Sequence, residues 1–161
     1  MALETYRLLV DQICEQTLIP NPAALYERTN LTIREVNFTL RHLEEGEHGT
    51  VVVHCDFGAL PTRGREAVLL RLLETNFYAF EGPSAPVLSF SDQTQRVVLS
   101  CKLPLVVDAS IILFLLSQFA DMAKAWRADF FLSNDKNTAP AASARRASTT
   151  LTRSLGAPVF R

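Results

Sequence analysis

Hydrophobic and polar residues follow two different periods along this chain, and the two periods predict helices and strands in turn. Apolar residues recur at three- and four-residue steps over 2–17, which predicts an amphipathic helix that Pro20 ends. Strict alternation over 36–43 and again over 50–57 predicts two strands. A hairpin between them pairs Leu40 with Val53, which puts both apolar rows on one face of the sheet.

The central region repeats this change of period with two longer helices. One helix is expected from an N-cap at Thr62 to about Phe80, and another from an N-cap at Asp108 to about Leu132. Two further strands are expected between them, near 86–91 and 96–102. The residues at 31–33 add a short optional strand. The order α-β-β-(β)-α-β-β-α predicts an α+β fold, a mostly antiparallel sheet with three helices.

Both central helices are apolar around most of their circumference, and one small core cannot bury both. The apolar area that the core cannot bury indicates a surface that binds another protein chain. On the helix at 65–80 one broad side is apolar, and we expect it to form a homodimer interface made of Leu69, Leu72, Leu73 and Phe77. Complete burial of this helix inside one subunit is the competing interpretation.

Length and charge define one domain with an extension. The chain has 161 residues, which favours a single domain. Residues 1–134 hold 11 Lys and Arg against 16 Asp and Glu, a net charge of −5, whereas residues 135–161 carry +4. We therefore expect a domain at 1–132 and a flexible basic tail at 133–161, rich in Ala, Ser and Thr. The overall charge of −1 argues against a nucleic-acid binder.

The sequence lacks the marks of secretion and of the membrane. Three widely spaced cysteines do not form a disulfide framework, the N-terminus does not resemble a secretory signal, and no apolar run reaches the length of a membrane span. A reducing cytoplasm is the expected compartment, with no membrane insertion.

No set of side chains predicts catalysis, a metal site or a cofactor. The histidines His42, His48 and His54 lie on or beside the first hairpin and do not converge on one point. Cys55 and Cys101 fall on inward strand positions, where a cysteine is most often a small buried hydrophobe. We therefore expect no enzymatic activity and no cofactor.

Several segments, taken in order, resemble the Tir-chaperone (CesT-like) family of type III secretion chaperones. A strand leads through D-F-G-A-L-P at 56–61 into a helix with paired leucines and a final E-x-N at 69–76. The strand RVVLSCKLPL at 96–105 follows, and the last helix carries A-x-x-W at 123–126. The resemblance covers about residues 1–132 and rests on the joint order of these segments rather than on any one of them.

This resemblance implies a cytoplasmic bacterial homodimer that is not an enzyme. Such a chaperone binds the N-terminal region of a secreted effector in extended form and keeps it stable and competent for export. The resemblance adds the secretion ATPase as a further candidate partner. An extended effector segment would add strands at sheet edges and fill apolar patches with alternate side chains. Our candidate effector-binding residues are Leu9, Val87 and Val98.

Two other functions fit parts of the sequence. A small α+β ligand-binding or regulatory domain without catalytic activity would need a concave pocket with convergent polar groups, for example around Cys55 or His54. A regulatory protein whose basic tail touches nucleic acid would bind in a strongly salt-dependent way, and the acidic domain disfavours it.

Overall fold

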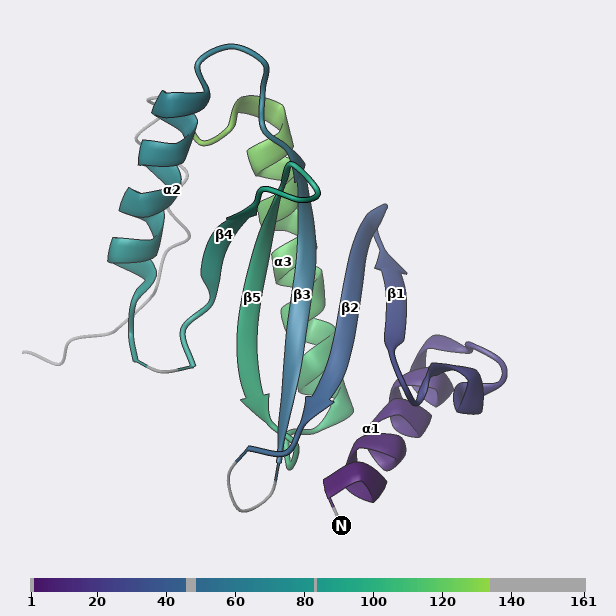
Figure 1. Cartoon of the computed structure of the whole chain (residues 1–161). Coiled ribbons are helices and arrows are strands. Elements are labelled where there is room, and N and C mark those ends of the chain that lie inside the picture. The colour runs from purple at the N-terminus through teal and green to yellow at the C-terminus, as the bar shows by residue number, and fades with distance from the viewer. Residues whose placement is uncertain (1, 46–48, 83, 134–161) are drawn as a thin grey trace, which may run out of the picture.

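Three α-helices accompany one antiparallel sheet in the computed structural model, which describes residues 2–45, 49–82 and 84–133 (Figure 1). The sheet has five strands in the order β1-β2-β3-β5-β4. The expected α+β fold is therefore confirmed. In chain order the elements are α1 (Ala2–Thr17), a 3-10 helix η1 (Pro22–Leu25), β1 (Thr29–Ile33), β2 (Val36–Leu43), β3 (Thr50–Ala59), α2 (Arg65–Ala79), β4 (Val87–Ser91), β5 (Arg96–Pro104) and α3 (Ala109–Asp129).

The alternating pattern sets the register of the strands. Leu40 pairs with Val53 between β2 and β3, as predicted. The optional strand is real and longer than expected, because β1 begins at Thr29. Arg34 and Glu35 join β1 to β2 with φ angles of 49° and 64°. Two successive left-handed residues between paired strands make a type I′ turn, the tight connection that matches the twist of a hairpin.

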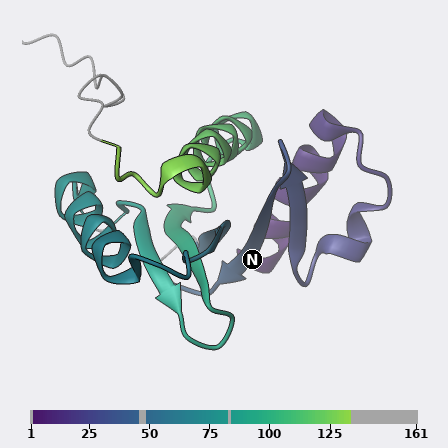
Figure 2. The ribbon, with the colours of Figure 1, turned by 90° about the horizontal axis from the view of Figure 1, so that it is seen from above.

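Helices α1 and α3 cover one face of the sheet. Figure 2 shows α3 alongside the sheet, α1 at its β1 end and α2 set apart beyond β4. Trp126 of α3 is 1% exposed, and its ring packs against those of Phe57 and Phe130. Tyr6 of α1 is buried too, and its hydroxyl donates to the Leu40 carbonyl at 3.0 Å. The core therefore lies between these two helices and the inner face of the sheet.

A β-bulge in β3 is held by the last helix. The pairing of β3 with β5 shifts register between Asp56 and Gly58. Arg127 Nε donates to the Phe57 carbonyl at 2.7 Å, and Arg127 Nη2 donates to the Asp56 carbonyl at 2.8 Å. Gly58 has a φ of 124° and lies against Trp126, so a side chain there would be strained.

The helix ends confirm one sequence prediction and correct two. Asp108 caps α3, and its carboxylate accepts from the Ser110 amide at 2.8 Å. The prediction of Thr62 as the cap of α2 is wrong, because the chain turns until Gly64, whose φ of 68° suits glycine. Helix α3 ends at Asp129 rather than Leu132, because the next residue is left-handed. The expected tail lies outside the described residues from position 134 onward.

Candidate protein-binding surface

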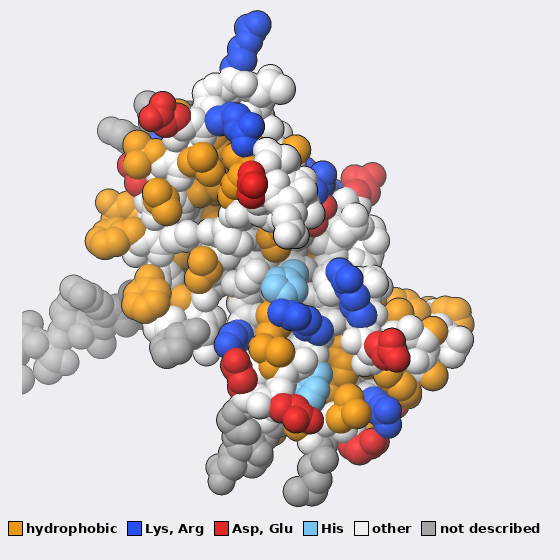
Figure 3. Space-filling view, viewed as in Figure 1, with side chains coloured by type: hydrophobic (Ala, Val, Ile, Leu, Met, Phe, Trp, Pro, Cys, Tyr) orange, Lys and Arg blue, Asp and Glu red, His pale blue; other side chains and the backbone are white. Residues whose placement is uncertain are grey.

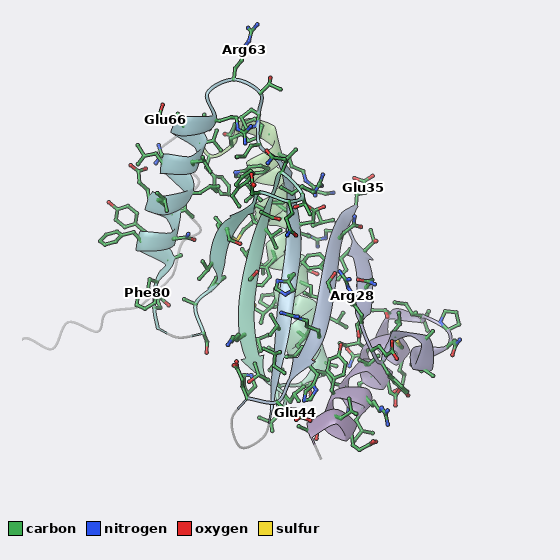
Figure 4. The ribbon with its side chains drawn as sticks, viewed as in Figure 1. Arg28, Glu35, Glu44, Arg63, Glu66 and Phe80 are labelled. Atoms are coloured by element: carbon green, nitrogen blue, oxygen red, sulfur yellow. The ribbon has the colours of Figure 1, made fainter. Side chains whose placement is uncertain are left out.

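Helix α2 is attached to the rest of the protein along one side only. It packs mainly on β4, where Val68 and Leu72 are buried. Its opposite face is bare: Leu70 is 59%, Leu73 66% and Phe77 78% exposed. Hydrophobic side chains gather over this helix in Figure 3, and Figure 4 places Glu66 and Phe80 at its two ends. We call Leu69, Leu70, Leu73 and Phe77 the α2 apolar face.

The predicted interface residues divide into two groups. Leu73 and Phe77 are exposed, and Leu69 is half-buried beside them. The assignment of Leu72 is wrong, because it is 4% exposed and belongs to the core of its own subunit. The sequence shows apolar residues around most of the helix but not which side meets β4. Leu70, which we did not predict, takes the place of Leu72 on the bare side.

The candidate effector-binding residues also divide. Val87 on β4 is 48% exposed and Val98 on β5 is half-buried, and Val98 pairs with Ser89 across the hairpin. The choice of Leu9 is wrong, because its side chain is 3% exposed. Helix α1 contacts both α3 and η1, so it buries a wider face than its main stripe predicts. Leu9 lies on that wider face.

A shallow hollow of about 330 Å³ lies on the outer face of the sheet around His54. His54 Nδ1 is 2.8 Å from the Ser100 hydroxyl oxygen, and burial with the nearby charges of Arg41 and Arg28 lowers the pKa of the imidazole. Arg28, labelled in Figure 4, points over this face. The hollow is lined by Arg41, Leu43, Val52, His54, Val87, Ser100, Cys101 and Lys102.

These groups do not form a catalytic set. His54 is bonded to Ser100, but the residues that line the hollow include no carboxylate that could orient the imidazole as a base. Burial raises the pKa of Cys55 to about 12 and of Cys101 to about 11, so both thiols stay protonated at neutral pH. Among the described residues no three metal-ligating side chains come together. His48 lies outside them.

The outer edge of β1 offers free backbone groups. Ile33 and Val36 flank the two-residue turn, so they form a hydrogen-bonded pair, and Leu31 with Phe38 forms the next one. The amide and carbonyl groups of the alternate residues, Asn30 and Thr32, therefore point away from β2. No described residue is hydrogen-bonded to them there. An extended segment of another chain can pair with this edge.

Helix α3 is long and apolar, with 21 residues. Within the described part of the chain it is the one helix whose length and composition would suit a membrane span. Its buried residues, among them Ile112, Leu116 and Trp126, pack on the sheet, however. Asp121 and Lys124 on its outer side are exposed to solvent. These contacts are those of a core helix.

The fold and a family comparison together identify this chain as a protein of the secretion-chaperone class. The family model of the Tir chaperone protein (CesT) family matches residues 24–127. The chain belongs to this family, as the resemblance in the sequence indicated. A search among proteins of curated function found no match.

Solved structures with the same fold come from protein complexes, one of which is described as a chaperone–effector complex. A chain of the ExsC–ExsE complex superposes with a TM-score of 0.63 at 18% identity, covering 77% of this chain and 92% of that chain. A chain of the HopA1–SchA chaperone–effector complex gives a TM-score of 0.60 at 13% identity, covering 80% and 97%. A chain of the ExoU–SpcU complex from the type III secretion system of Pseudomonas aeruginosa gives 0.54 at 20% identity, covering 71% and 92%.

Proposed function

We propose that this protein is a cytoplasmic, homodimeric type III secretion chaperone without enzymatic activity. It binds the N-terminal region of a secreted effector in extended form and keeps it stable for export. Membership of the Tir chaperone protein (CesT) family supports the chaperone role, and the similar structures include a chaperone–effector complex. Contact with the secretion ATPase stays a prediction.

The exposure of the α2 apolar face is the observation that supports the proposed dimer. Three large side chains, Leu70, Leu73 and Phe77, are each more than half exposed on one side of one helix. Patches of this kind on soluble proteins mark interaction sites. A second copy of the chain covers the face through a twofold axis, because the same patch is then buried on both subunits. An ordinary stable interface removes about 800 Å² per partner from water.

The effector segment takes other surfaces. The open outer edge of β1 receives it as an added strand, because backbone hydrogen bonds there do not depend on the effector's sequence. Val87 and Val98 are proposed as apolar contacts on the outer face of the second hairpin. Ordering the segment costs roughly 2–5 kcal/mol of the gross interaction. A dimer offers two such surfaces to one effector, and the second contact benefits from high effective concentration.

Sedimentation of the purified chain tests the dimer. The wild type is expected to be a dimer at micromolar concentration. Leu73→Asp is expected to raise the dimer dissociation constant by about 30-fold or more, because 2 kcal/mol is typical of an interface hot spot. Val106→Asp is the matched control, since Val106 is 67% exposed but lies outside the α2 apolar face. A monomeric wild type, or an unaffected Leu73→Asp dimer, would remove this interface from the proposal.

Co-purification from the native host tests the effector. The expected result is one secreted protein, or a small set, bound through its N-terminal region. Limited proteolysis of the complex should leave that region protected while the rest of the effector is cut. Recovery of the chaperone with no secreted protein, under conditions where secretion is active, contradicts the proposal.

A further inference from the structure

The sheet has two edge strands, β1 and β4, and a side chain of α2 bonds to the edge of β4. An exposed edge strand is a template for pairing with another chain, and natural proteins usually carry features at such edges that prevent this pairing. The edge strand β4, with the sequence VLSFS, contains no charge and no proline, and Val87 at its start is 48% exposed. This composition favours pairing of β4 with the β4 strand of a second copy of the chain.

One side chain of α2 occupies this edge. Asn76 Nδ2 donates to the Leu88 carbonyl at 2.8 Å, and the Leu88 amide donates to Asn76 Oδ1 at 2.8 Å. Leu88 lies opposite Leu99 of β5. Because its amide and carbonyl bond to Asn76, they point away from β5, toward the side where a further strand would pair. The Asn76 amide thus makes the two hydrogen bonds that a neighbouring strand would make to Leu88.

The chemistry of this contact requires a carboxamide. A neutral amide carries a donor and an acceptor on one planar group, which matches a backbone N–H and C=O together. A carboxylate at the same place accepts from the Leu88 amide but cannot donate to its carbonyl. A leucine of similar size does neither. Asn76 is also well placed for this contact. Helix α2 packs mainly on β4, and the buried Leu72, one turn before Asn76, anchors the helix there.

We propose that Asn76 closes the β4 edge of the sheet against edge-to-edge pairing with a second copy of β4. The side chain acts as a one-residue substitute for a sixth strand. Where the proposed function holds, the same closure keeps an extended effector segment away from β4 and leaves the β1 edge to receive it. The closure itself does not depend on a client or on the α2 dimer.

Hydrogen exchange of the Leu88 amide tests the closure directly. In Asn76→Leu this amide is expected to exchange about tenfold faster, since a lost hydrogen bond is worth about 1–1.5 kcal/mol. Asn76→Asp keeps the acceptor, so its Leu88 amide should exchange more slowly than in Asn76→Leu. Asn37→Leu is the matched control, because Asn37 bonds only to the Thr32 hydroxyl on the sheet surface. Unchanged exchange in Asn76→Leu would overturn the proposal.

Assembly in solution tests the consequence. Sedimentation of Asn76→Leu at increasing concentration is expected to show species larger than the wild-type protein, whereas Asn37→Leu shows none. Adding Ser89→Lys to Asn76→Leu should abolish them, because a lysine in the middle of an edge strand prevents pairing. Ser89 is exposed and outward-facing, so this change leaves the core intact.

The lysine variant separates edge pairing from damage to the fold. If Asn76→Leu assembles through partial unfolding, Ser89→Lys does not rescue it and thermal unfolding shows the loss of stability; that result contradicts the proposal. Absence of larger species in Asn76→Leu at every concentration contradicts it too. A wild-type chain found to be monomeric would refute the α2 dimer and leave both of these tests unaffected.

Discussion

Helices α2 and α3 are both apolar around most of their surface, yet they differ in how much of that surface is buried. Helix α3 lies along the inner face of the sheet with α1 at its side, and Ile112, Leu116 and Trp126 are fully buried. Helix α2 lies beyond the edge strand and buries only Val68 and Leu72. An apolar helix can therefore be a core element or a binding element, and its position beside the sheet decides which.

The difference follows from the number of neighbours each helix has within the subunit. The sheet and α1 together cover a wide arc of α3, whereas α2 meets one edge strand that covers a narrow arc. The remaining apolar surface of α2 is stable in water only when another protein covers it. Substitutions in α3 should therefore act on the folding of the subunit, and substitutions on the exposed side of α2 should act on association.

The largest expected effect is on the folding of the subunit. Trp126→Ala in α3 should lower the free energy of unfolding by about 3–5 kcal/mol, because it empties a site between two aromatic rings. Urea denaturation followed by circular dichroism measures this loss. The loss should not depend on protein concentration. A loss below about 1 kcal/mol would show that α3 is less central to the core than its burial indicates.

The matching change in α2 should affect association instead. Phe77→Ala removes an exposed ring, so the stability of the subunit should change by less than about 0.5 kcal/mol. The dimer should weaken by about 2 kcal/mol, as expected for an aromatic anchor. Sedimentation measures the loss of dimer affinity. Urea denaturation of the Leu73→Asp monomer, with and without Phe77→Ala, measures the change in subunit stability. A large loss of subunit stability would place Phe77 in the core and remove the contrast with α3.

A smaller effect is expected where α3 holds the bulge of β3. Arg127→Ala removes two short hydrogen bonds to the Asp56 and Phe57 carbonyls and should cost about 1–2 kcal/mol. The cost is modest because the guanidinium is partly exposed and water can replace it. Arg127→Lys should restore less than half, since an ammonium group cannot contact both carbonyls in the same fork geometry. Denaturation of both variants measures the difference.

The smallest effect is a pH dependence from the outer face of the sheet. Burial and the charges of Arg41 and Arg28 lower the pKa of His54 in the folded protein. The unfolded chain then binds more protons below its own pKa of about 6.5, so stability should fall as the pH drops from 7 toward 5. NMR titration should place the His54 pKa below that of a free histidine. His54→Gln should reduce the slope of stability against pH.

Local patterns in the sequence predicted the elements and the strand pairing well. Alternation fixes which side of a strand is buried, so the pairing of Leu40 with Val53 followed from the residues alone. The prediction of Cys55 as an inward residue is confirmed for the same reason. The strand at 29–33 was only partly predicted, because its first inward position is a buried threonine, Thr29, rather than a large apolar residue.

Properties that depend on how elements meet were not predictable in this way. Leu9 and Leu72 are buried by partners distant in sequence, which a helical stripe does not reveal. Gly64 caps α2 through its backbone angle, although Thr62 has the better capping side chain. The bonds of Asn76 join residues 12 positions apart on a helix and a strand. Only the packing of α2 on β4 places them together.

The contact between Arg127 and β3 also constrains how a growing chain can fold. The guanidinium comes from the last turn of α3, and the carbonyls that it binds lie some 70 positions earlier. During synthesis the pairing of β3 with β5 therefore has no support at its bulge until Arg127 has left the ribosome. Shortening the protein at any point before this arginine therefore removes more than a terminus: it leaves the middle of the sheet without the group that fixes its bend.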